Sequence, residues 1–294
     1  MANDQIVESA YAKINLTLEI IGKRRDGYHN LASVMQTVDL SDDVVISEAD
    51  TLTIECDDQS ISSEINLAGK AAQVLADEVG RKPEVRIDIS KNIPVSGGLG
   101  GGSTDAAAVL RGLNQLWTLD LSLDELTEIA AKIGSDVPFL VRGGTSLVQG
   151  RGEEVTPIAD APIGRVLVLY PNIDLEQPTQ KTANVFAHVT PNLYTRGNLT
   201  HKLAARIRSE GDCPPEFFFN QFGTIGDELF DGWSDQVGLL HSLGATDVFM
   251  CGAGPSMFTV PPSKELGTAW HLLLTSVYQR SAFLAEPVPG IREE

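Results

Sequence analysis

The sequence predicts an α+β protein of two domains, and three observations support this prediction. The chain has 294 residues, more than the roughly 100–200 of one typical domain. Strand-like and helix-like segments are interspersed, but not in the strict alternation of a doubly wound sheet. Glycine and proline cluster at residues 150–164, which indicates a domain junction. We therefore expect an N-terminal domain at residues 1–157 and a C-terminal domain at residues 158–294.

The N-terminal half is predicted to begin with strands and to continue with helices. Asp26-Gly27 is a strong turn signal and separates the first two strands. Alternating apolar and polar residues predict strands at residues 8–20, 31–38, 43–47, 51–56, 84–90 and 139–149. Apolar residues at helical spacing predict helices at residues 66–78, 103–117 and 123–133.

The C-terminal half shows the same mixture of elements after the junction. Residues 172–197 are polar and are predicted to form a loop. Strands are predicted at residues 165–170, 247–251, 257–260 and 281–285. Helices are predicted at residues 199–209, 229–243 and 264–274.

Composition narrows the classes of partner. Hydrophobic residues make up 42% of the chain and charged residues 21%, so the chain can bury a core. The formal net charge is −18, which repels nucleic acid and anionic membrane surfaces. We expect neither of them as a partner. An anionic small-molecule substrate would have to be held by local features, such as a helix N-terminus.

The cysteines and the apolar segments indicate a cytoplasmic protein. The three cysteines are far apart and form no CxxC pair, so neither a zinc site nor a disulfide framework is expected. No stretch of 18 consecutive apolar residues occurs, and residues 1–20 lack the basic and apolar regions of a signal peptide. Nothing in the sequence indicates an oligomeric state.

A glycine-rich loop is the strongest functional signal. The segment PVSGGLGGGSTDAA at residues 94–107 follows a predicted strand and opens a predicted helix. Glycines allow close approach of the backbone to a ligand, and a helix N-terminus favours phosphate. The segment is neither a Walker A motif nor a GxGxxG fingerprint, and the alternative is a flexible loop before a helix. The candidate phosphate-binding residues are Pro94, Val95, Ser96, Gly97, Gly98, Leu99, Gly100, Gly101, Gly102, Ser103 and Thr104.

This loop, in the form PxxxGLGGGSxxAA, resembles the ATP-binding motif of the GHMP kinases, such as galactokinase, homoserine kinase and mevalonate kinase. The resemblance implies a two-domain α+β fold with its active site in the cleft between the domains. It also implies ATP and Mg²⁺ as cofactors, with the loop wrapped around the triphosphate. Ser103, expected as the first helical residue, would cap the helix or reach phosphate or Mg²⁺. No Mg²⁺ ligand is predicted beyond phosphate oxygens.

Two further motifs carry the candidate catalytic residues. Asp136 lies in IGSDVPF. Without the resemblance, a structural role in a turn or helix cap would explain it as well as a catalytic role. Lys13 lies in AKINL, inside an apolar strand, where the alternative is an outward position on an edge strand. By resemblance to the GHMP kinases, Asp136 is the base that takes the proton of the attacking hydroxyl, and Lys13 orients it and offsets negative charge. We expect the two side chains to form a pair.

The segment GKRRDGYHN narrows the resemblance to one branch of the GHMP kinases. DGYH soon after AKINL is characteristic of the kinases of cytidine diphosphate-linked methylerythritol, in which Tyr and His form a cytosine pocket. Tyr28 would stack on the base, His29 would hydrogen-bond its edge, and Asn15 would bind substrate from the strand face of Lys13. Taken alone, Tyr28 would be a packing residue and His29 a surface residue.

Two segments of the predicted C-terminal domain complete the resemblance. In PTQKTANVFAHVTP, at residues 178–191, Phe186 is the expected stacking partner of Tyr28 across the base, and Thr182 is a lesser candidate. GAGPSMF, at residues 252–258, resembles the glycine turn that packs beside the phosphate loop in the superfamily. The pair Asn220-Gln221 stands where this branch usually has Asn-Asp.

The resemblance implies ATP-dependent phosphorylation of the 2-hydroxyl of cytidine diphosphate-linked methylerythritol, a step in non-mevalonate isoprenoid precursor biosynthesis. Two alternatives remain open. One is a GHMP kinase of the homoserine or mevalonate type, which would have no cytosine to explain DGYH and Phe186. The other is a catalytically silent member that binds a small molecule, against which the presence of both Lys13 and Asp136 counts.

Overall fold

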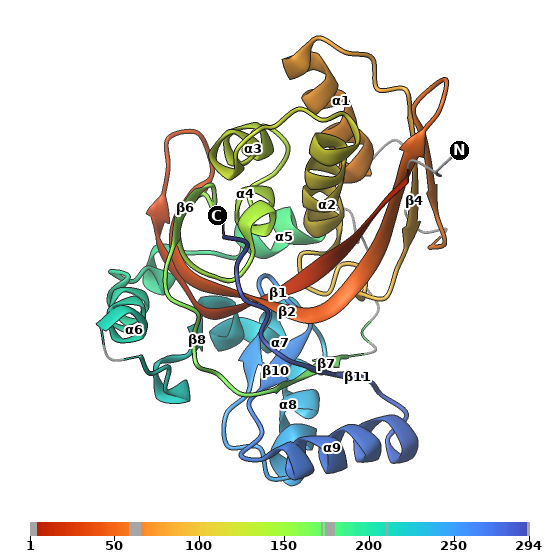
Figure 1. The fold of residues 1–294 in the computed structure, drawn as a ribbon. Coiled ribbons are helices and arrows are strands. Elements are labelled where there is room, and N and C mark those ends of the chain that lie inside the picture. The colour runs from red at the N-terminus through yellow and green to blue at the C-terminus, as the bar shows by residue number, and fades with distance from the viewer. Residues whose placement is uncertain (1–4, 59–65, 172, 174–179, 210, 293–294) are drawn as a thin grey trace.

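The computed structural model describes residues 5–58, 66–171, 173, 180–209 and 211–292. Its helices and strands form an α+β architecture, so the predicted fold class is confirmed. Figure 1 shows a large curved sheet with helices α1–α4 on one side, and a smaller sheet with helices α8 and α9 on the other side. In the described part of the chain, no helix combines the length and hydropathy that crossing a bilayer requires.

The large sheet is built on two long antiparallel strands, β1 (Gln5–Lys23) and β2 (His29–Glu48). Strand β2 pairs with β4 (Val85–Ser90) at one end and with β5 (Thr145–Gly150) at the other. The remaining strands are β3 (Thr53–Cys56), β6 (Glu154–Pro157) and β8 (Phe219–Asn220), which pair with β4, β5 and β1, respectively. Because β1 runs through the centre of the sheet, its side chains reach the middle of the molecule.

Helices bury one face of this sheet. They are α1 (Leu67–Val79), α2 (Gly101–Leu116), α3 (Leu123–Ala130) and α4 (Val137–Arg142). The core between these helices and the strands includes Leu75, Ile87 and Leu110, all fully buried. Asn66 accepts a hydrogen bond from the backbone N–H of Ala68 and so caps the start of α1.

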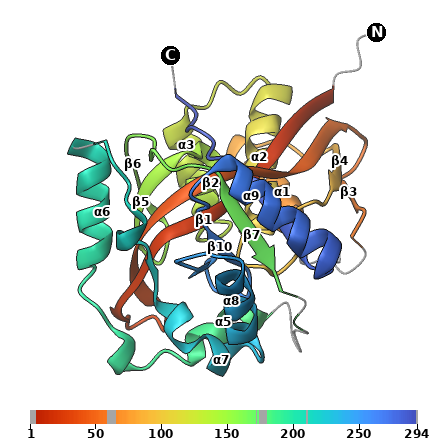
Figure 2. The ribbon, with the colours of Figure 1, turned by 90° about the horizontal axis from the view of Figure 1, so that it is seen from below.

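The smaller sheet has the strand order β11–β7–β10–β9. Its strands are β7 (Val166–Tyr170), β9 (Phe249–Met250), β10 (Met257–Thr259) and β11 (Ser281–Ala285). The helices of this half are α5 (Lys181–Ala187), α6 (Asn198–Ser209), α7 (Gly226–Leu229), α8 (Trp233–Ser242) and α9 (Lys264–Leu272). Seen from below, α8 and α9 lie in front of the long strands (Figure 2).

The chain crosses between the two predicted domains more than once. Strand β8 joins the large sheet beside β1. After β11, the chain returns to the N-terminal half, where Pro287 bridges Val38 and the backbone N–H of Ile291 donates to the carbonyl of Arg142 at 2.9 Å. The predicted domain boundary between residues 157 and 158 stays a prediction. These contacts connect residues 1–157 with residues 158–294.

Some predicted elements of the first half were wrong in type or extent. Residues 139–149 were predicted as a strand interrupted by Gly143-Gly144, but the part before these glycines is helix α4 and only the part after them, β5, is a strand. Gly143 and Gly144 separate them, with φ of 65° and 69°, a conformation that ends a helix and that glycine adopts readily. The strands predicted at residues 31–38 and 43–47 are one strand, because an irregularity opposite Tyr11 and Ala12 lets β2 continue.

The second half differs from prediction in two places. The predicted loop at residues 172–197 contains α5 and a 3₁₀ turn at Pro191–Leu193, while residues 172 and 174–179 lie outside the described residues. The helix predicted at residues 229–243 is interrupted, because Phe230 is extended and Gly232 has a φ of 73°.

The core under α1 predicts a clear difference between two substitutions on this helix. Leu75→Ala removes a fully buried side chain and leaves a cavity, so we expect the free energy of unfolding to fall by about 2–5 kcal/mol. Gln73→Ala, on the exposed side of the same helix, should change it by about 0.5 kcal/mol or less. Urea denaturation of both variants measures this, and equal losses would contradict the described packing.

Candidate active site

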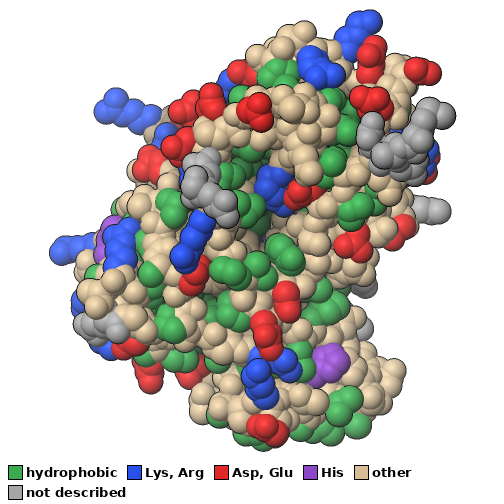
Figure 3. Space-filling view, viewed as in Figure 1, with side chains coloured by type: hydrophobic (Ala, Val, Ile, Leu, Met, Phe, Trp, Pro, Cys, Tyr) green, Lys and Arg blue, Asp and Glu red, His purple; other side chains and the backbone are tan. Residues whose placement is uncertain are grey.

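A cleft of about 1680 Å³ contains most of the residues that the sequence singled out. It is larger than the roughly 300–1,000 Å³ of a typical small-molecule site, so it has room for two ligands. The glycine loop, Lys13, Asp136, Tyr28, and residues of α5 line it. Figure 3 shows a face of the molecule that is hollowed near its centre, with basic and acidic side chains at the edge of the hollow.

The glycine loop ends in the N-terminus of α2, but two residues earlier than predicted. The helix begins at Gly101, and Gly100 is its N-cap with φ of 79° and no side-chain cap. Ser103 is therefore the third helical residue, and the expectation that it caps the helix was wrong. The first backbone N–H groups of a helix have no partner within it, and here they lie at the cleft.

Backbone contacts fix this loop against the turn at residues 252–258. A Cβ atom on Gly98 would lie 2.0 Å from the carbonyl oxygen of Cys251, and one on Gly252 would lie 2.6 Å from the carbonyl oxygen of Gly98. The backbone N–H of Ser256 also donates to the carbonyl of Gly97 at 3.1 Å. Only residues without a side chain allow these two segments to approach so closely.

Asn220 supports the turn from below. Its Nδ2 donates to the carbonyl oxygens of Met250 and Gly252 at 2.7 and 2.8 Å, and its Oδ1 accepts from the backbone N–H of Phe222. The side chain is 5% exposed. The amide thus satisfies backbone groups that the turn would otherwise leave buried without partners.

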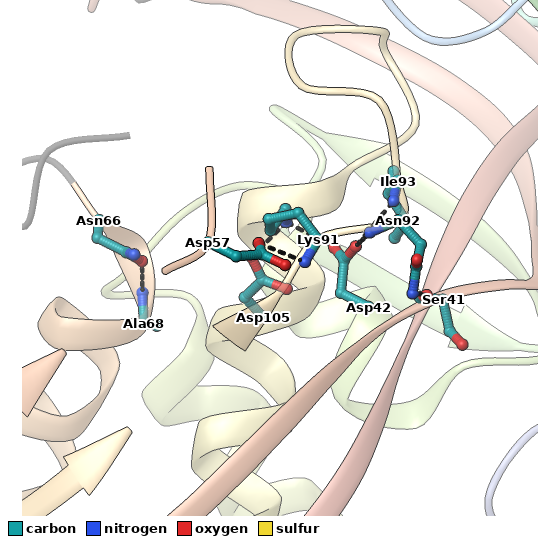
Figure 4. Close-up of polar contacts among 9 residues, drawn as sticks. All are labelled: Ser41, Asp42, Asp57, Asn66, Ala68, Lys91, Asn92, Ile93 and Asp105. Atoms are coloured by element: carbon teal, nitrogen blue, oxygen red, sulfur yellow. Dashed lines mark hydrogen bonds and ion pairs between the residues drawn. The ribbon is translucent and has the colours of Figure 1, made fainter. Parts of the chain in front are cut away.

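A buried ionic cluster holds the segment that leads into the glycine loop (Figure 4). Nζ of Lys91 lies 2.5 Å from Oδ2 of Asp42 and 2.6 Å from Oδ2 of Asp105, on β2 and α2, respectively. Oδ1 of Asp42 accepts the backbone N–H groups of Asn92 and Ile93. Sequence reasoning missed this cluster because its members are separated by up to 63 positions, and only Asp105 lies in a motif that the sequence singled out.

The pKa values of Lys91 and Asp105 are shifted in this cluster. Burial raises the pKa of Asp105, the ammonium of Lys91 opposes this increase and the carboxylate of Asp42 adds to it, and the resulting pKa is about 7. Burial alone would lower the pKa of Lys91, but the carboxylates of Asp105 and Asp42 raise it. The cluster therefore keeps its lysine charged and tolerates a proton on Asp105 near neutral pH.

Lys13 and Asp136 face each other in the cleft. Nζ of Lys13 lies 3.7 Å from Oδ2 of Asp136 and donates to Oδ1 of Asn15 at 2.9 Å. Nδ2 of Asn15 in turn donates to Ser33 at 2.8 Å. Lys13 is 4% exposed, whereas Asp136, the residue before α4, is 31% exposed. A buried ammonium therefore lies beside a carboxylate that remains accessible to a ligand.

A third charged residue, which sequence reasoning missed, lies close to this pair. Lys181 begins α5, is 8% exposed, and donates from Nζ to the carbonyl of Gly254. Burial lowers the pKa of Lys181, the positive charge of Lys13 lowers it as well, Asp136 opposes the change, and the resulting pKa is about 7. Sequence reasoning missed Lys181 because it lies in a segment predicted to be a polar loop, where a lysine is expected to be exposed.

The residues predicted to bind a base line the same cleft. The rings of His29 and Phe186 stack at 5.5 Å with an interplanar angle of 24°. The guanidinium of Arg151, not Phe186, lies over the ring of Tyr28 at 5.1 Å. The predicted pairing of Phe186 with Tyr28 across a base stays a prediction; both rings line the cleft, and Tyr28 is 55% exposed whereas His29 is buried at 6%.

His29 and Thr182 complete this part of the cleft. Nε2 of His29 is buried and has no hydrogen-bond partner among the described residues, and burial lowers the pKa of the ring. Thr182 lines the cleft from α5, one helical turn before Phe186. Residues 178 and 179 of the predicted segment lie outside the described residues.

Comparison with known proteins decides the family. Residues 66–144 match the family described as GHMP kinases N terminal domain. A 4-diphosphocytidyl-2-C-methyl-D-erythritol kinase of Dehalococcoides mccartyi is 37% identical over 256 residues, which cover 87% of this chain and 89% of the relative. One of Bacillus cereus is 39% identical over 269 residues, which cover 86% and 87%.

The chain belongs to the 4-diphosphocytidyl-2-C-methyl-D-erythritol kinase family of the GHMP kinases. A crystal structure of a 4-(cytidine 5'-diphospho)-2C-methyl-D-erythritol kinase superimposes with a TM-score of 0.79 at 27% identity, covering 97% of this chain and 100% of the other. Homoserine kinase from Cytophaga hutchinsonii shares the fold, with a TM-score of 0.76 at 16% identity, covering 99% and 96%. The chain is thus an ATP-dependent small-molecule kinase with the two-domain GHMP fold.

The contact between the glycine loop and the turn predicts a specific loss of nucleotide binding in this kinase. Gly98→Ala would place a methyl group against the carbonyl of Cys251 at a φ of 85°, so the loop must shift. We expect the affinity for MgATP to fall at least tenfold. Gly164→Ala is the matched control, because a Cβ there meets nothing within 4 Å. Isothermal titration calorimetry measures both, and unchanged affinity in Gly98→Ala would contradict the described geometry.

The ionic cluster predicts a pH dependence of stability. The folded-state pKa of Asp105 is about 7, against 3.8 for an ordinary Asp, so between these values the folded protein binds more protons than the unfolded chain. The contribution of Asp105 to the free energy of unfolding therefore falls as pH rises from about 4 to 7. Asp105→Asn should remove this contribution.

Denaturant titrations from pH 4.5 to 7.5 test this by measuring the difference in the free energy of unfolding between the variant and the unaltered protein. We expect that difference to change across the window for Asp105→Asn. It should stay constant for Asp120→Asn, which changes an exposed carboxyl. Parallel pH profiles for Asp105→Asn and the unaltered protein would show that the titration of Asp105 has been misassigned.

Proposed function

We propose that this kinase transfers the γ-phosphoryl group of ATP to the 2-hydroxyl of 4-diphosphocytidyl-2-C-methyl-D-erythritol. The observation that carries the proposal is the position of Asp136 and Lys13 in one cleft with the glycine loop. The names of the relatives from Dehalococcoides mccartyi and Bacillus cereus support the choice of substrate.

The glycine loop binds the triphosphate in this proposal. Residues 98–103 line the cleft, and their backbone N–H groups with the N-terminus of α2 favour anionic oxygens. Thr104, also predicted from the loop, is buried and does not line the cleft, because its backbone N–H donates to the carbonyl of Gly100. Because Gly98 and Gly100 have no side chains, the loop packs directly against the carbonyl of Cys251 and the side chain of Lys13, which fixes its backbone at the cleft. Such local features are necessary in a chain with a net charge of −18, which otherwise repels anionic ligands.

Asp136 and Lys13 carry the transfer. The carboxylate of Asp136 takes the proton of the 2-hydroxyl as that oxygen bonds to the γ-phosphorus, the bond to the bridging oxygen breaks, and ADP leaves. The ammonium of Lys13 orients the carboxylate and offsets charge on the transferring phosphoryl group. Asn15 fixes Lys13 through their 2.9 Å hydrogen bond. Most of the rate enhancement comes from positioning, as in other phosphoryl transfers.

Mg²⁺ would accompany ATP and neutralise phosphate charge. Among the described residues, no three side chains of His, Cys, Asp or Glu converge in a way that could hold a metal ion. This arrangement suits Mg²⁺, which keeps several waters and is commonly held through substrate phosphates and few protein groups. Ser103, in the first turn of α2, could add a hydroxyl to phosphate or metal.

The base pocket selects the acceptor. We assign the cytosine to the part of the cleft lined by Tyr28, His29, Thr182 and Phe186. The unpartnered Nε2 of His29 can hydrogen-bond the edge of a base, and the aromatic rings can stack on its faces. Homoserine and mevalonate have no ring that would use these groups.

The same proposal places the reaction between an N-terminal unit at residues 1–157 and a C-terminal unit at residues 158–294. The first contributes Lys13, the glycine loop and Asp136, and the second contributes Phe186 and the turn at residues 252–258. We also propose a cytoplasmic location, which is supported by cysteines that form no disulfide among the described residues.

Substitution of Asp136 tests the proposed base. Asp136→Asn keeps the shape of the side chain but cannot accept the proton, so we expect kcat to fall by about 10²–10⁴ with the affinity for MgATP retained. Asp160→Asn, which changes a carboxyl outside the cleft, should leave kcat unchanged.

Coupled measurement of ADP release should use 4-diphosphocytidyl-2-C-methyl-D-erythritol, homoserine and mevalonate as acceptors. We expect turnover with the first alone. Turnover of homoserine or mevalonate instead would refute the base pocket, and near-normal turnover by Asp136→Asn would refute the role of Asp136.

A further inference from the structure

Lys181 is a buried lysine whose position the mechanism above does not use. It lines the cleft from the first residue of α5 and is 8% exposed. Among the described residues, its one hydrogen-bond partner is the carbonyl of Gly254. An ammonium has three N–H donors, so hydrogen-bonding capacity remains for a ligand.

The groups around Lys181 make its charge depend on what the cleft contains. Lys13 on β1 repels a proton on Lys181, whereas Asp136 before α4 and Cys251 after β9 favour one. Together with burial, they bring the pKa of Lys181 to about 7. Without an added anion, the side chain is thus mostly neutral at pH 8.

Helix α5 connects Lys181 to the base pocket. Phe186 lies five positions further along the helix, which corresponds to about 7.5 Å along its axis. Phe186 stacks on His29, whereas Lys181 interacts electrostatically with Lys13 and Asp136. The helix therefore extends from the base pocket to the transfer centre, the same path that a base linked through phosphates to an acceptor hydroxyl would follow.

We propose that Lys181 is a further phosphate-binding residue of this site, which takes up a proton when a phosphate-bearing ligand enters and then contacts its oxygens. The inference rests on the proposed function. Negative charge close to an amine stabilises the protonated form, so ligand binding and proton uptake are coupled. The phosphate could belong to the nucleotide or to the diphosphate of the acceptor, and the experiment separates these sources.

Calorimetric titration at pH 8, in buffers of different ionisation enthalpy, counts the protons taken up on binding. One arm uses the magnesium complex of AMPPNP, and the other uses cytidine diphosphate. Terminal phosphates, with pKa near 6, are already ionised at this pH and contribute little. We expect a net uptake of protons in the arm whose phosphate reaches Lys181, because a lysine with a pKa of about 7 is mostly neutral at pH 8.

Variants assign the proton to its residue. Lys181→Met, or Lys181→Gln if the first does not fold, should bind the ligand with no uptake. Lys202→Met, on the exposed side of α6, should behave as the unaltered protein. If neither variant at residue 181 folds, the pH dependence in the unaltered protein decides, with uptake expected to rise from pH 6 to pH 8.

Three results would overturn the inference: uptake near zero in both arms for the unaltered protein, undiminished uptake after substitution of Lys181, or an uptake that does not vary between pH 6 and 8. A lysine that only supports the turn through Gly254 would give the first result. Because turnover is not measured, a wrong acceptor assignment leaves the nucleotide arm interpretable. Absence of uptake, in turn, leaves the acceptor assignment intact.

Discussion

The close backbone contact between the glycine loop and the turn at residues 252–258 is the constraint on which the site depends. Gly98 and Gly252 meet where neither could carry a side chain, and Asn220 holds the turn in place. A Cβ on Gly252 would also lie 2.7 Å from Nζ of Lys13, so the same turn bounds the catalytic lysine. Loop, lysine and turn come from distant parts of the chain, and this contact makes them one surface.

The sequence alone predicted the fold class, most elements and many of the residues that line the cleft. This was possible because the chemistry is concentrated in short segments, each with a distinctive local pattern. A run of glycines before a helix indicates a phosphate-binding site, and a lysine within an apolar strand indicates a buried charged residue with a functional role. Lys13 and Asp136 are 3.7 Å apart although 123 positions separate them.

What sequence reasoning missed depends on tertiary contacts. Lys91 and Lys181 have partners far away in the chain, so no local pattern distinguishes them from exposed lysines. The apolar run in α4 fits a strand as well as a buried helix, and only the positive φ of Gly143 and Gly144 ends the helix there. The stacking of Phe186 on His29 likewise follows from how α5 packs, which the surrounding polar residues do not reveal.

A crystal structure of the complex with AMPPNP, Mg²⁺ and 4-diphosphocytidyl-2-C-methyl-D-erythritol tests the central claim, that one cleft joins a phosphate loop, a catalytic pair and a base pocket. The account predicts the triphosphate along residues 97–103, the cytosine among Tyr28, His29 and Phe186, and the 2-hydroxyl within about 3.2 Å of the carboxylate of Asp136. A cytosine bound elsewhere, or a 2-hydroxyl directed away from Asp136, would contradict it.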